Sequence, residues 1–138
     1  MTPLDRALVG GARRARALLA TLAVGVALTG PAHANPGAAA QVEIDHLLDF
    51  VGASQCAFIR NGTAHPADAA KTHLVEKFQF AKGRIATAEE FIRYVATSSS
   101  ITGEVYRVRC GAAEVPAGAW LGDELSRFRL TLAATPAR

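Results

Sequence analysis

The stretch that most constrains the fold runs from Arg84 to Cys110, because a helix start, an amphipathic helix, a turn and an alternating strand succeed one another there without a break. Thr87 followed by Glu90 is a capping-box pattern. In such a box the Thr side chain accepts a hydrogen bond from an amide of the first turn, and the Glu side chain reaches back to the cap amide. A helix is therefore predicted to begin at Ala88.

The second half of this stretch predicts the end of the helix and the strand after it. Apolar side chains share one face of the helix, at Phe91, Ile92 and Val95. Ser98–Ser100 should end the helix, since their hydroxyl groups compete for backbone hydrogen bonds, and Gly103 turns the chain. Residues 105–110 then alternate as a strand does, with Tyr106, Val108 and Cys110 on one face and Arg107 and Arg109 on the other.

Three more helices and one more strand are predicted outside this stretch. Residues 39–53 carry a helical stripe of Ile44, Leu47, Leu48 and Val51. Residues 56–60 form a β-like run that ends at Asn61-Gly62, a dipeptide suited to positive φ in a turn. A second helix starts at Pro66. After a loop at residues 112–116, a last helix carries Trp120 beside a stripe of Leu121, Leu125, Phe128 and Leu132. No internal repeat is apparent in the sequence.

Together these elements predict a mainly α, α+β fold: about four helices with a short two-stranded β ribbon, in which residues 56–60 pair with residues 105–110. Residues 41–132 are expected to form a single globular domain. A flexible leader at residues 35–40 precedes this domain, and a frayed tail at residues 133–138 comes after it.

An export signal is predicted at the start of the chain. Arginines precede an apolar run from Ala17 to Leu28, which then meets the small-residue site Ala32-His33-Ala34. The run is shorter than the ~20 residues that span a membrane, so residues 1–34 are predicted to be a signal peptide cleaved after Ala34. The general secretory route is the default, although Arg13-Arg14 leaves the twin-arginine route open. We expect a periplasmic protein without stable membrane insertion after cleavage.

The positive charge of the chain lies mainly in this signal. The sequence holds 15 Lys and Arg against 12 Asp and Glu, but four of the basic residues, and only Asp5 of the acidic ones, precede residue 35. The mature domain is therefore close to neutral, and the sequence shows no clustered basic face. This argues against nucleic acid as a partner.

Both cysteines, Cys56 and Cys110, lie in the exported part. An even number of cysteines in an oxidising compartment favours a disulfide, and two cysteines allow one pairing. The bridge would close a long loop, and this closure would stabilise the fold by roughly 4 kcal/mol in the chain-entropy model. The alternatives are two independent buried thiols or a reactive pair.

Several motifs in a fixed order resemble the YfeK-like family of small exported bacterial proteins, over about residues 44–109. The motifs are Phe58-Ile59-Arg60-Asn61-Gly62, His73-Leu74, Thr87-Ala88-Glu89-Glu90-Phe91-Ile92, Ser98-Ser99-Ser100-Ile101-Thr102-Gly103 and Tyr106. The resemblance implies a periplasmic location in a Gram-negative bacterium and a domain of unknown function. It brings no established activity and no catalytic residue, and the two cysteines and Trp120 lie outside the shared motifs.

Arg60, Asn61, His73 and Lys77 are the candidate binding residues. Arg60 comes directly after a buried strand, beside a turn with exposed amides and ahead of a helix, so that its guanidinium group is placed to hold a carboxylate or phosphate. It is equally well placed to pair with a carboxylate of its own domain. His73 and Lys77 are one helical turn apart and form either a titratable pair in a cleft or a partly buried His with Lys77 extending past it.

Two classes of function remain. The first is a non-catalytic binding or protein-interaction module for a periplasmic protein or a small anionic ligand, with no cofactor. The second is a small hydrolase in which His73 activates a serine of Ser98–Ser100. The sequence lacks a nucleophile elbow, and the serine run is better explained as a helix end and turn. No metal site is expected, because the spacing of His65 and His73 does not suit metal ligands.

Overall fold

The computed structural model describes residues 35–135, which contain four α-helices, one π-helical turn and four strands. The elements in chain order are α1 (Ala38–Ala53), β1 (Ala57–Arg60), β2 (Thr63–His65), α2 (Ala67–Ala81), α3 (Ala88–Phe91), the π-helical turn η1 (Ile92–Ala96), β3 (Arg107–Cys110), β4 (Ala113–Pro116) and α4 (Ala117–Ala134). The predicted signal peptide lies outside the described residues, as does the end of the predicted tail.

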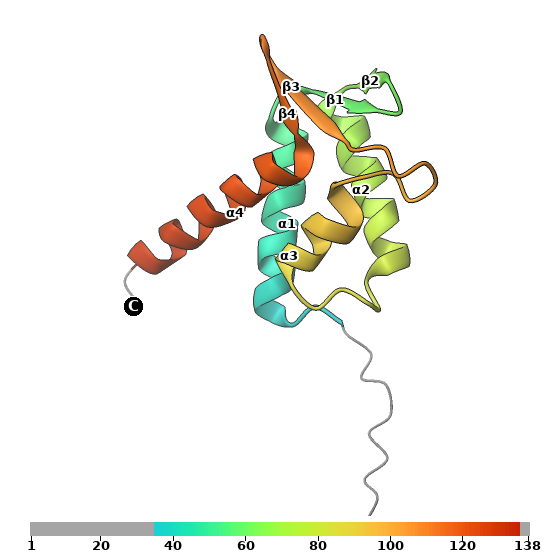
Figure 1. The fold of residues 1–138 in the computed structure, drawn as a ribbon. Helices are drawn as coiled ribbons and strands as arrows, with labels where there is room; N and C mark the ends of the chain where they lie inside the picture. The colour runs from blue at the N-terminus through green and yellow to red at the C-terminus, as the bar shows by residue number, and fades with distance from the viewer. Residues whose placement is uncertain (1–34, 136–138) are drawn as a thin grey trace, which may run out of the picture. The chain divides into compact units, whose positions relative to one another are not determined.

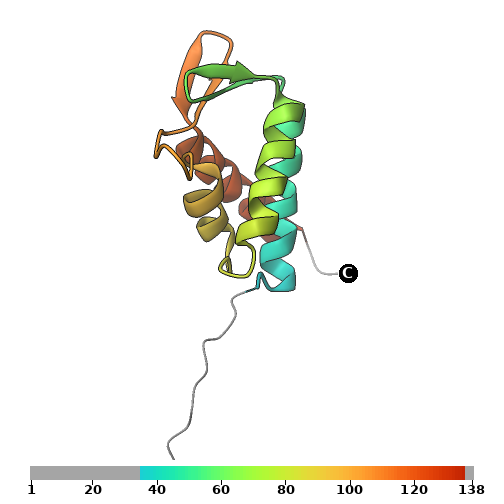
Figure 2. The same cartoon turned by 90° about the vertical axis from the view of Figure 1, so that its right-hand side faces the viewer.

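α1 and α2 lie side by side and run in opposite directions, and the sheet lies over the end at which they are joined (Figures 1 and 2). The apolar stripe predicted for α1 is buried in full and packs with α2 and α3. Where α2 meets α3, the rings of Phe78 and Phe91 pack edge to face with centroids 5.5 Å apart. The core is completed by Ile85, Val95, Val108, Leu121 and Leu125.

The capping box at the start of α3 forms nearly as predicted. The Thr87 side chain accepts a hydrogen bond from the Glu90 amide at 3.2 Å. Glu90 reaches back one residue further than expected, because its carboxylate accepts from the Ala86 amide at 2.7 Å. The helix begins at Ala88, as the sequence predicts, and continues into η1, which ends at Ala96 with Thr97 as its C-cap, just before the serine run.

The sheet has four strands, so the prediction of a two-stranded ribbon is wrong. All three pairings are antiparallel, in the order β2-β1-β3-β4. The predicted central pair is present, with Phe58 opposite Val108. The edge strands β2 and β4 carry little apolar pattern because their side chains are mostly exposed. The segment predicted as a loop after residue 111 is therefore mostly strand β4.

Two hairpin turns connect these strands, and each depends on positive φ. Asn61 and Gly62 both adopt positive φ between β1 and β2, the pattern of a type I′ hairpin. Gly111 adopts positive φ between β3 and β4. Glycine tolerates this conformation without steric cost, and Asn does so more readily than most residues.

The chain repeats its element order although the sequence shows no repeat. Each half contains a helix, a two-residue hairpin and a second helix, and equivalent elements begin at the same spacing: Ala38 and Ala88, Ala57 and Arg107, Thr63 and Ala113, Ala67 and Ala117. Pro66 and Pro116 hold the same N-cap position. The β1–β3 register is symmetric about Phe58 and Val108, which are themselves equivalent residues.

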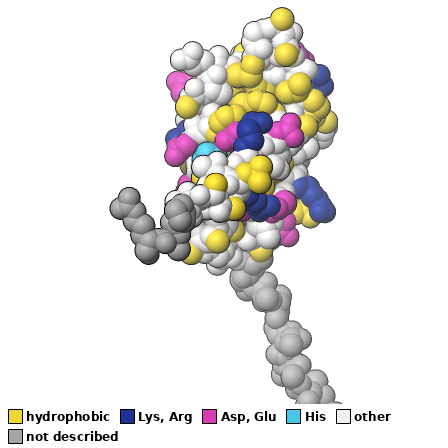
Figure 3. All heavy atoms as spheres, turned by 90° about the vertical axis from the view of Figure 1, so that its left-hand side faces the viewer, with side chains coloured by type: hydrophobic (Ala, Val, Ile, Leu, Met, Phe, Trp, Pro, Cys, Tyr) yellow, Lys and Arg dark blue, Asp and Glu magenta, His cyan; other side chains and the backbone are white. Residues whose placement is uncertain are grey.

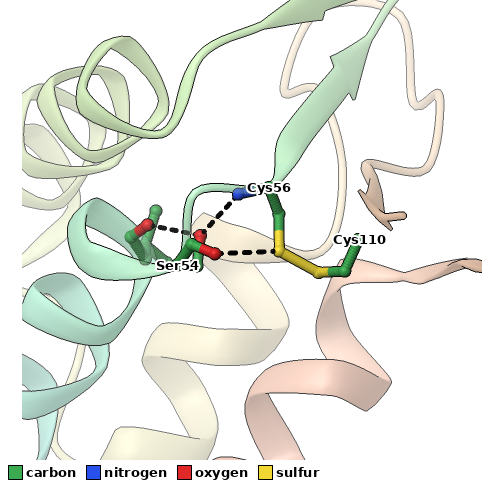
Figure 4. The surroundings of a disulfide bond; sticks show 4 residues. Ser54, Cys56 and Cys110 are labelled. Atoms are coloured by element: carbon green, nitrogen blue, oxygen red, sulfur yellow. Dashed lines mark hydrogen bonds between the residues drawn. A yellow bond between two sulfur atoms is a disulfide. The ribbon is translucent and has the colours of Figure 1, made fainter.

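Cys56 and Cys110 form the predicted disulfide at one end of the β1–β3 pair (Figure 4). Ser54 positions the chain on the Cys56 side. Its hydroxyl donates to the Val51 carbonyl at 2.8 Å and accepts from the Cys56 amide at 3.3 Å. The bridge therefore links the end of α1 to the β3–β4 hairpin.

The two ends of the domain differ from the predicted leader and tail. α1 begins at Ala38, inside the predicted leader, because a run of alanines favours helix. α4 continues to Ala134, inside the predicted tail, and exposes Leu132 of the predicted stripe. Figure 3 shows the face at the left of Figure 1, where α4 lies; apolar side chains gather there beside basic and acidic ones.

Ion pairs hold α4 to the other helices. The Arg129 guanidinium donates to Glu43 of α1 at 2.7 and 2.8 Å and to Glu89 of α3 at 2.6 Å. His46 of α1 meets Glu124 at 2.7 Å. The predicted apolar contacts of Leu121 and Leu125 are thus supplemented by polar contacts along the same helix.

Candidate functional site

A small cleft opens where the β1–β2 hairpin and α2 face the start of α4. Its volume is about 90 Å³. The floor is apolar and includes Ala70 and Leu74 of α2 and Leu121 of α4. The polar lining residues are Arg60, His65, His73 and Tyr106. None of the lining residues is acidic, so the cleft combines an apolar floor with a positively charged rim.

Strand geometry explains why Arg60 and Tyr106 share this cleft. In the β1–β3 register, Ile59 lies opposite Arg107. The next antiparallel pair along this register is Arg60 with Tyr106, and both side chains point to the sheet face that carries Phe58 and Val108. This pair lies at the end of the strands opposite the disulfide.

Arg60 has no ion-pair or side-chain hydrogen-bond partner among residues 35–135. Its side chain is half-buried at the cleft. Of the two roles that the sequence leaves open, the internal ion pair is not formed within these residues. The guanidinium group is therefore available to a carboxylate or phosphate from outside the domain.

His73 and Tyr106 form a hydrogen-bonded pair beside this cation. The Nε2 atom of His73 lies 3.3 Å from the Tyr106 hydroxyl oxygen. Burial lowers the pKa of His73, and the positive charges of Arg60 and Lys77 lower it further. Burial raises the pKa of Tyr106. At neutral pH the cleft therefore presents a neutral imidazole and a protonated phenol, both able to hydrogen-bond a ligand.

Lys77 belongs to the protein's own structure rather than to the cleft. Its ammonium group donates to the backbone oxygens of Val95, at 2.8 Å, and Ser98. It also lies 5.0 Å from the centre of the Tyr106 ring. Lys77 thus satisfies carbonyl groups at the end of η1, and burial lowers its pKa.

Asn61 also lies apart from the cleft. Its side-chain oxygen accepts a hydrogen bond from the Thr102 hydroxyl at 2.8 Å, which ties the hairpin turn to the loop after η1. Of the four predicted binding residues, the structure brings Arg60 and His73 together in the cleft and gives Asn61 and Lys77 contacts elsewhere.

The pairing that a serine hydrolase needs is not formed. Within residues 35–135, the side-chain partner of His73 is Tyr106 and not a serine. Ser99 is buried, and its oxygen accepts from the amides of Ile101 and Thr102. The serine run therefore forms the turn that the sequence also allows.

Apart from Arg60 and His73, the residues that line the cleft are not among the predicted binding residues, and these include His65, Ala70 and Tyr106. Tyr106 was detectable in principle, since the alternation of its strand and the predicted pairing with residues 56–60 place it opposite Arg60. The sequence points to His65 only as a possible metal ligand with His73, and the spacing of the two does not suit that role. In the part of the chain that the structure describes, no group of three or more His, Cys, Asp or Glu side chains is placed to hold a metal ion.

The fold defines a small disulfide-bonded domain of paired helices and hairpins, with an apolar cleft that carries Arg60 at its rim. The chain belongs to the Family of unknown function (DUF5329), whose model matches residues 38–129. It is also 43% identical over 84 residues to the Uncharacterized protein YfeK of Salmonella typhimurium, an alignment that covers 60% of this chain and 70% of that protein. The resemblance predicted from the sequence motifs is thus confirmed. No solved structure matches the chain.

Proposed function

We propose that the protein is a periplasmic binding module that holds an anionic group of a partner protein or small ligand at Arg60 and does not convert it chemically. Arg60, which is half-buried at the cleft and has no ion-pair partner among the described residues, carries this proposal. A guanidinium group binds carboxylates and phosphates through paired hydrogen bonds. His73 and Tyr106 supply further hydrogen-bonding groups at the same rim.

Two features support export to the periplasm. The sequence predicts a cleaved signal at residues 1–34, and the disulfide is of the kind that persists in oxidising compartments. Between Asn35 and Thr135 no helix combines the length and the apolar character needed to cross a membrane.

The test compares Arg60→Ala with Arg109→Ala. Arg109 is an arginine of the same strand pair, but it lies on the opposite face of the sheet and pairs with Glu114 at 2.7 Å. Isovalerate, acetate and inorganic phosphate are titrated into each protein, and binding is monitored by NMR shifts of the Ile59, His73 and Tyr106 amides.

We expect at least one of these anions to shift the cleft amides of the wild type and of Arg109→Ala. Arg60→Ala should bind none of them and should unfold at nearly the wild-type temperature, since no internal ion pair is lost. Equal shifts in Arg60→Ala, or no shift with any of the three anions, would refute the proposal.

A further inference from the structure

We infer that the cleft binds a small monocarboxylate with its apolar end inserted and its carboxylate on Arg60, and that Ala70 provides the space for the apolar end. This inference rests on the proposed function and names the class of ligand. Its sources are a free short-chain acid or the carboxyl-terminal residue of a polypeptide with a small apolar side chain.

The repeat within the chain identifies Ala70 as the residue that keeps the cleft open. Ala70 and Trp120 stand at the same place after the N-cap prolines Pro66 and Pro116. Trp120 fills its surroundings, since its ring packs against Phe50 and Phe58 with centroids 4.4 and 5.8 Å away. Ala70 carries no ring at this position; it is buried and lines the cleft.

The two ends of the β1–β3 strand pair show a second difference between the halves. Arg60 and Tyr106 occupy the positions equivalent to Cys110 and Cys56, so one end of the β1–β3 pair is covalently closed and the other carries a cation and a phenol. The two differences, Ala70 for Trp120 and Arg60 with Tyr106 for the disulfide, meet in one cleft.

The charges of the lining residues favour a single negative charge on the ligand. Arg60 is the unpaired cation of the cleft among the described residues, and the ammonium group of Lys77 is held by two backbone carbonyls. Burial and the neighbouring cations favour the neutral form of His73. One guanidinium group matches one carboxylate.

The size and polarity of the cleft limit the rest of the ligand. Pockets that enclose drug-sized molecules measure roughly 300–1,000 Å³, several times the 90 Å³ found here. The walls beside Ala70 are apolar, including Phe58, Leu74 and Ala117. A branched group of a few carbon atoms suits this space, and a polar group there would lose its hydrogen bonds to water.

The experiment measures the affinities of acetate, isovalerate and N-acetylvaline by NMR titration of the full mature protein. Burial of the additional carbon atoms should make isovalerate bind at least about tenfold more tightly than acetate, at roughly 0.8 kcal/mol per buried methylene group. Tighter binding of N-acetylvaline than of isovalerate identifies a polypeptide terminus as the source, and the reverse order identifies a free acid.

Ala70→Leu fills the cleft and should weaken isovalerate binding about tenfold or more, with little effect on acetate. Ala70→Val is the milder variant if the leucine disturbs folding. Ala119→Leu is the control, because Ala119 is an exposed alanine of α4 outside the cleft.

Equal affinities for acetate and isovalerate, both dependent on Arg60, would overturn the inference and leave the proposed function standing. Isovalerate binding that persists unchanged in both Ala70 variants would also overturn the inference. If Arg60→Ala binds the anions as tightly as the wild type does, the proposed function is refuted as well.

Discussion

Ala70 and Trp120 occupy equivalent positions in the two halves of the domain, yet one lines an open cleft and the other fills its surroundings with an indole ring. The difference lies in the side chains and not in the backbone plan, because both residues come after an N-cap proline and a buried alanine at the same spacing. The cleft is therefore a local departure from the repeat, and it coincides with the half-buried Arg60.

Lys77 should matter for stability rather than for binding. Lys77→Met keeps an apolar stem but leaves the Val95 and Ser98 carbonyls without their donor. We expect the free energy of unfolding, measured in urea, to fall by about 1–3 kcal/mol. Lys82→Met, at an exposed position just after α2, should change it by less than about 0.5 kcal/mol. If Lys77→Met were as stable as the wild type but no longer bound the anion, Lys77 would instead be a ligand-binding residue.

If the protein is exported, as proposed, the disulfide should be formed in protein taken from the periplasm and should contribute to stability. Peptide mapping without reductant is expected to yield one cross-linked Cys56–Cys110 pair. Replacing both cysteines by serine should lower the free energy of unfolding by about 2–5 kcal/mol, since the bridge restricts the unfolded chain. Recovery of two alkylatable thiols from the periplasmic protein would contradict this prediction.

His73 should make stability depend on pH. Its pKa is lower in the folded protein than in the unfolded chain, because of burial and the charges of Arg60, Lys77 and His65, with Glu76 opposing them. The unfolded chain therefore binds the proton more tightly, and stability falls as the pH drops from above the unfolded pKa toward the folded one.

His73→Gln should consequently lose less stability than the wild type between about pH 7.5 and pH 5. Urea unfolding at both pH values measures the difference. A bound carboxylate should raise the pKa of His73, which an NMR titration of the ring with and without isovalerate can detect. An identical pH dependence of stability in the variant and the wild type would show that the pKa of His73 is the same in the folded and the unfolded chain.

Export predicts the mass of the mature protein. If the signal is removed after Ala34, the periplasmic chain begins at Asn35, and intact-mass measurement of the periplasmic fraction should find that species. A chain that retains residues 1–34 would rule out cleavage.

Local patterns in the sequence were sufficient to predict the central helices and strands. The Thr87 capping box, the stripe of α1 and the alternation before Cys110 each depend on neighbours along the chain, and the structure contains all three. β2 and β4 were not predictable in this way, because exposed edge strands need no apolar alternation. Their positions are set by hairpin turns that let each edge strand pair with its neighbour.

The candidate site was predictable only in part, for a related reason. Strand position and helix periodicity bring Arg60 and His73 near each other, and both line the cleft. The directions of Asn61 and Lys77 depend on partners that are distant in sequence, namely Thr102 and the carbonyls of Val95 and Ser98. Whether Arg60 has an internal counter-charge likewise depends on the tertiary fold.

The symmetric register about Phe58 and Val108 has the form of an isologous interface, in which the same contact occurs twice around a central pair. In a homodimer such an interface depends on protein concentration, and both copies must carry the same side chains. Here the two halves share one chain, so their association survives any dilution. Each half also has its own sequence, so that one end of the strand pair can be closed by a disulfide while the other remains open.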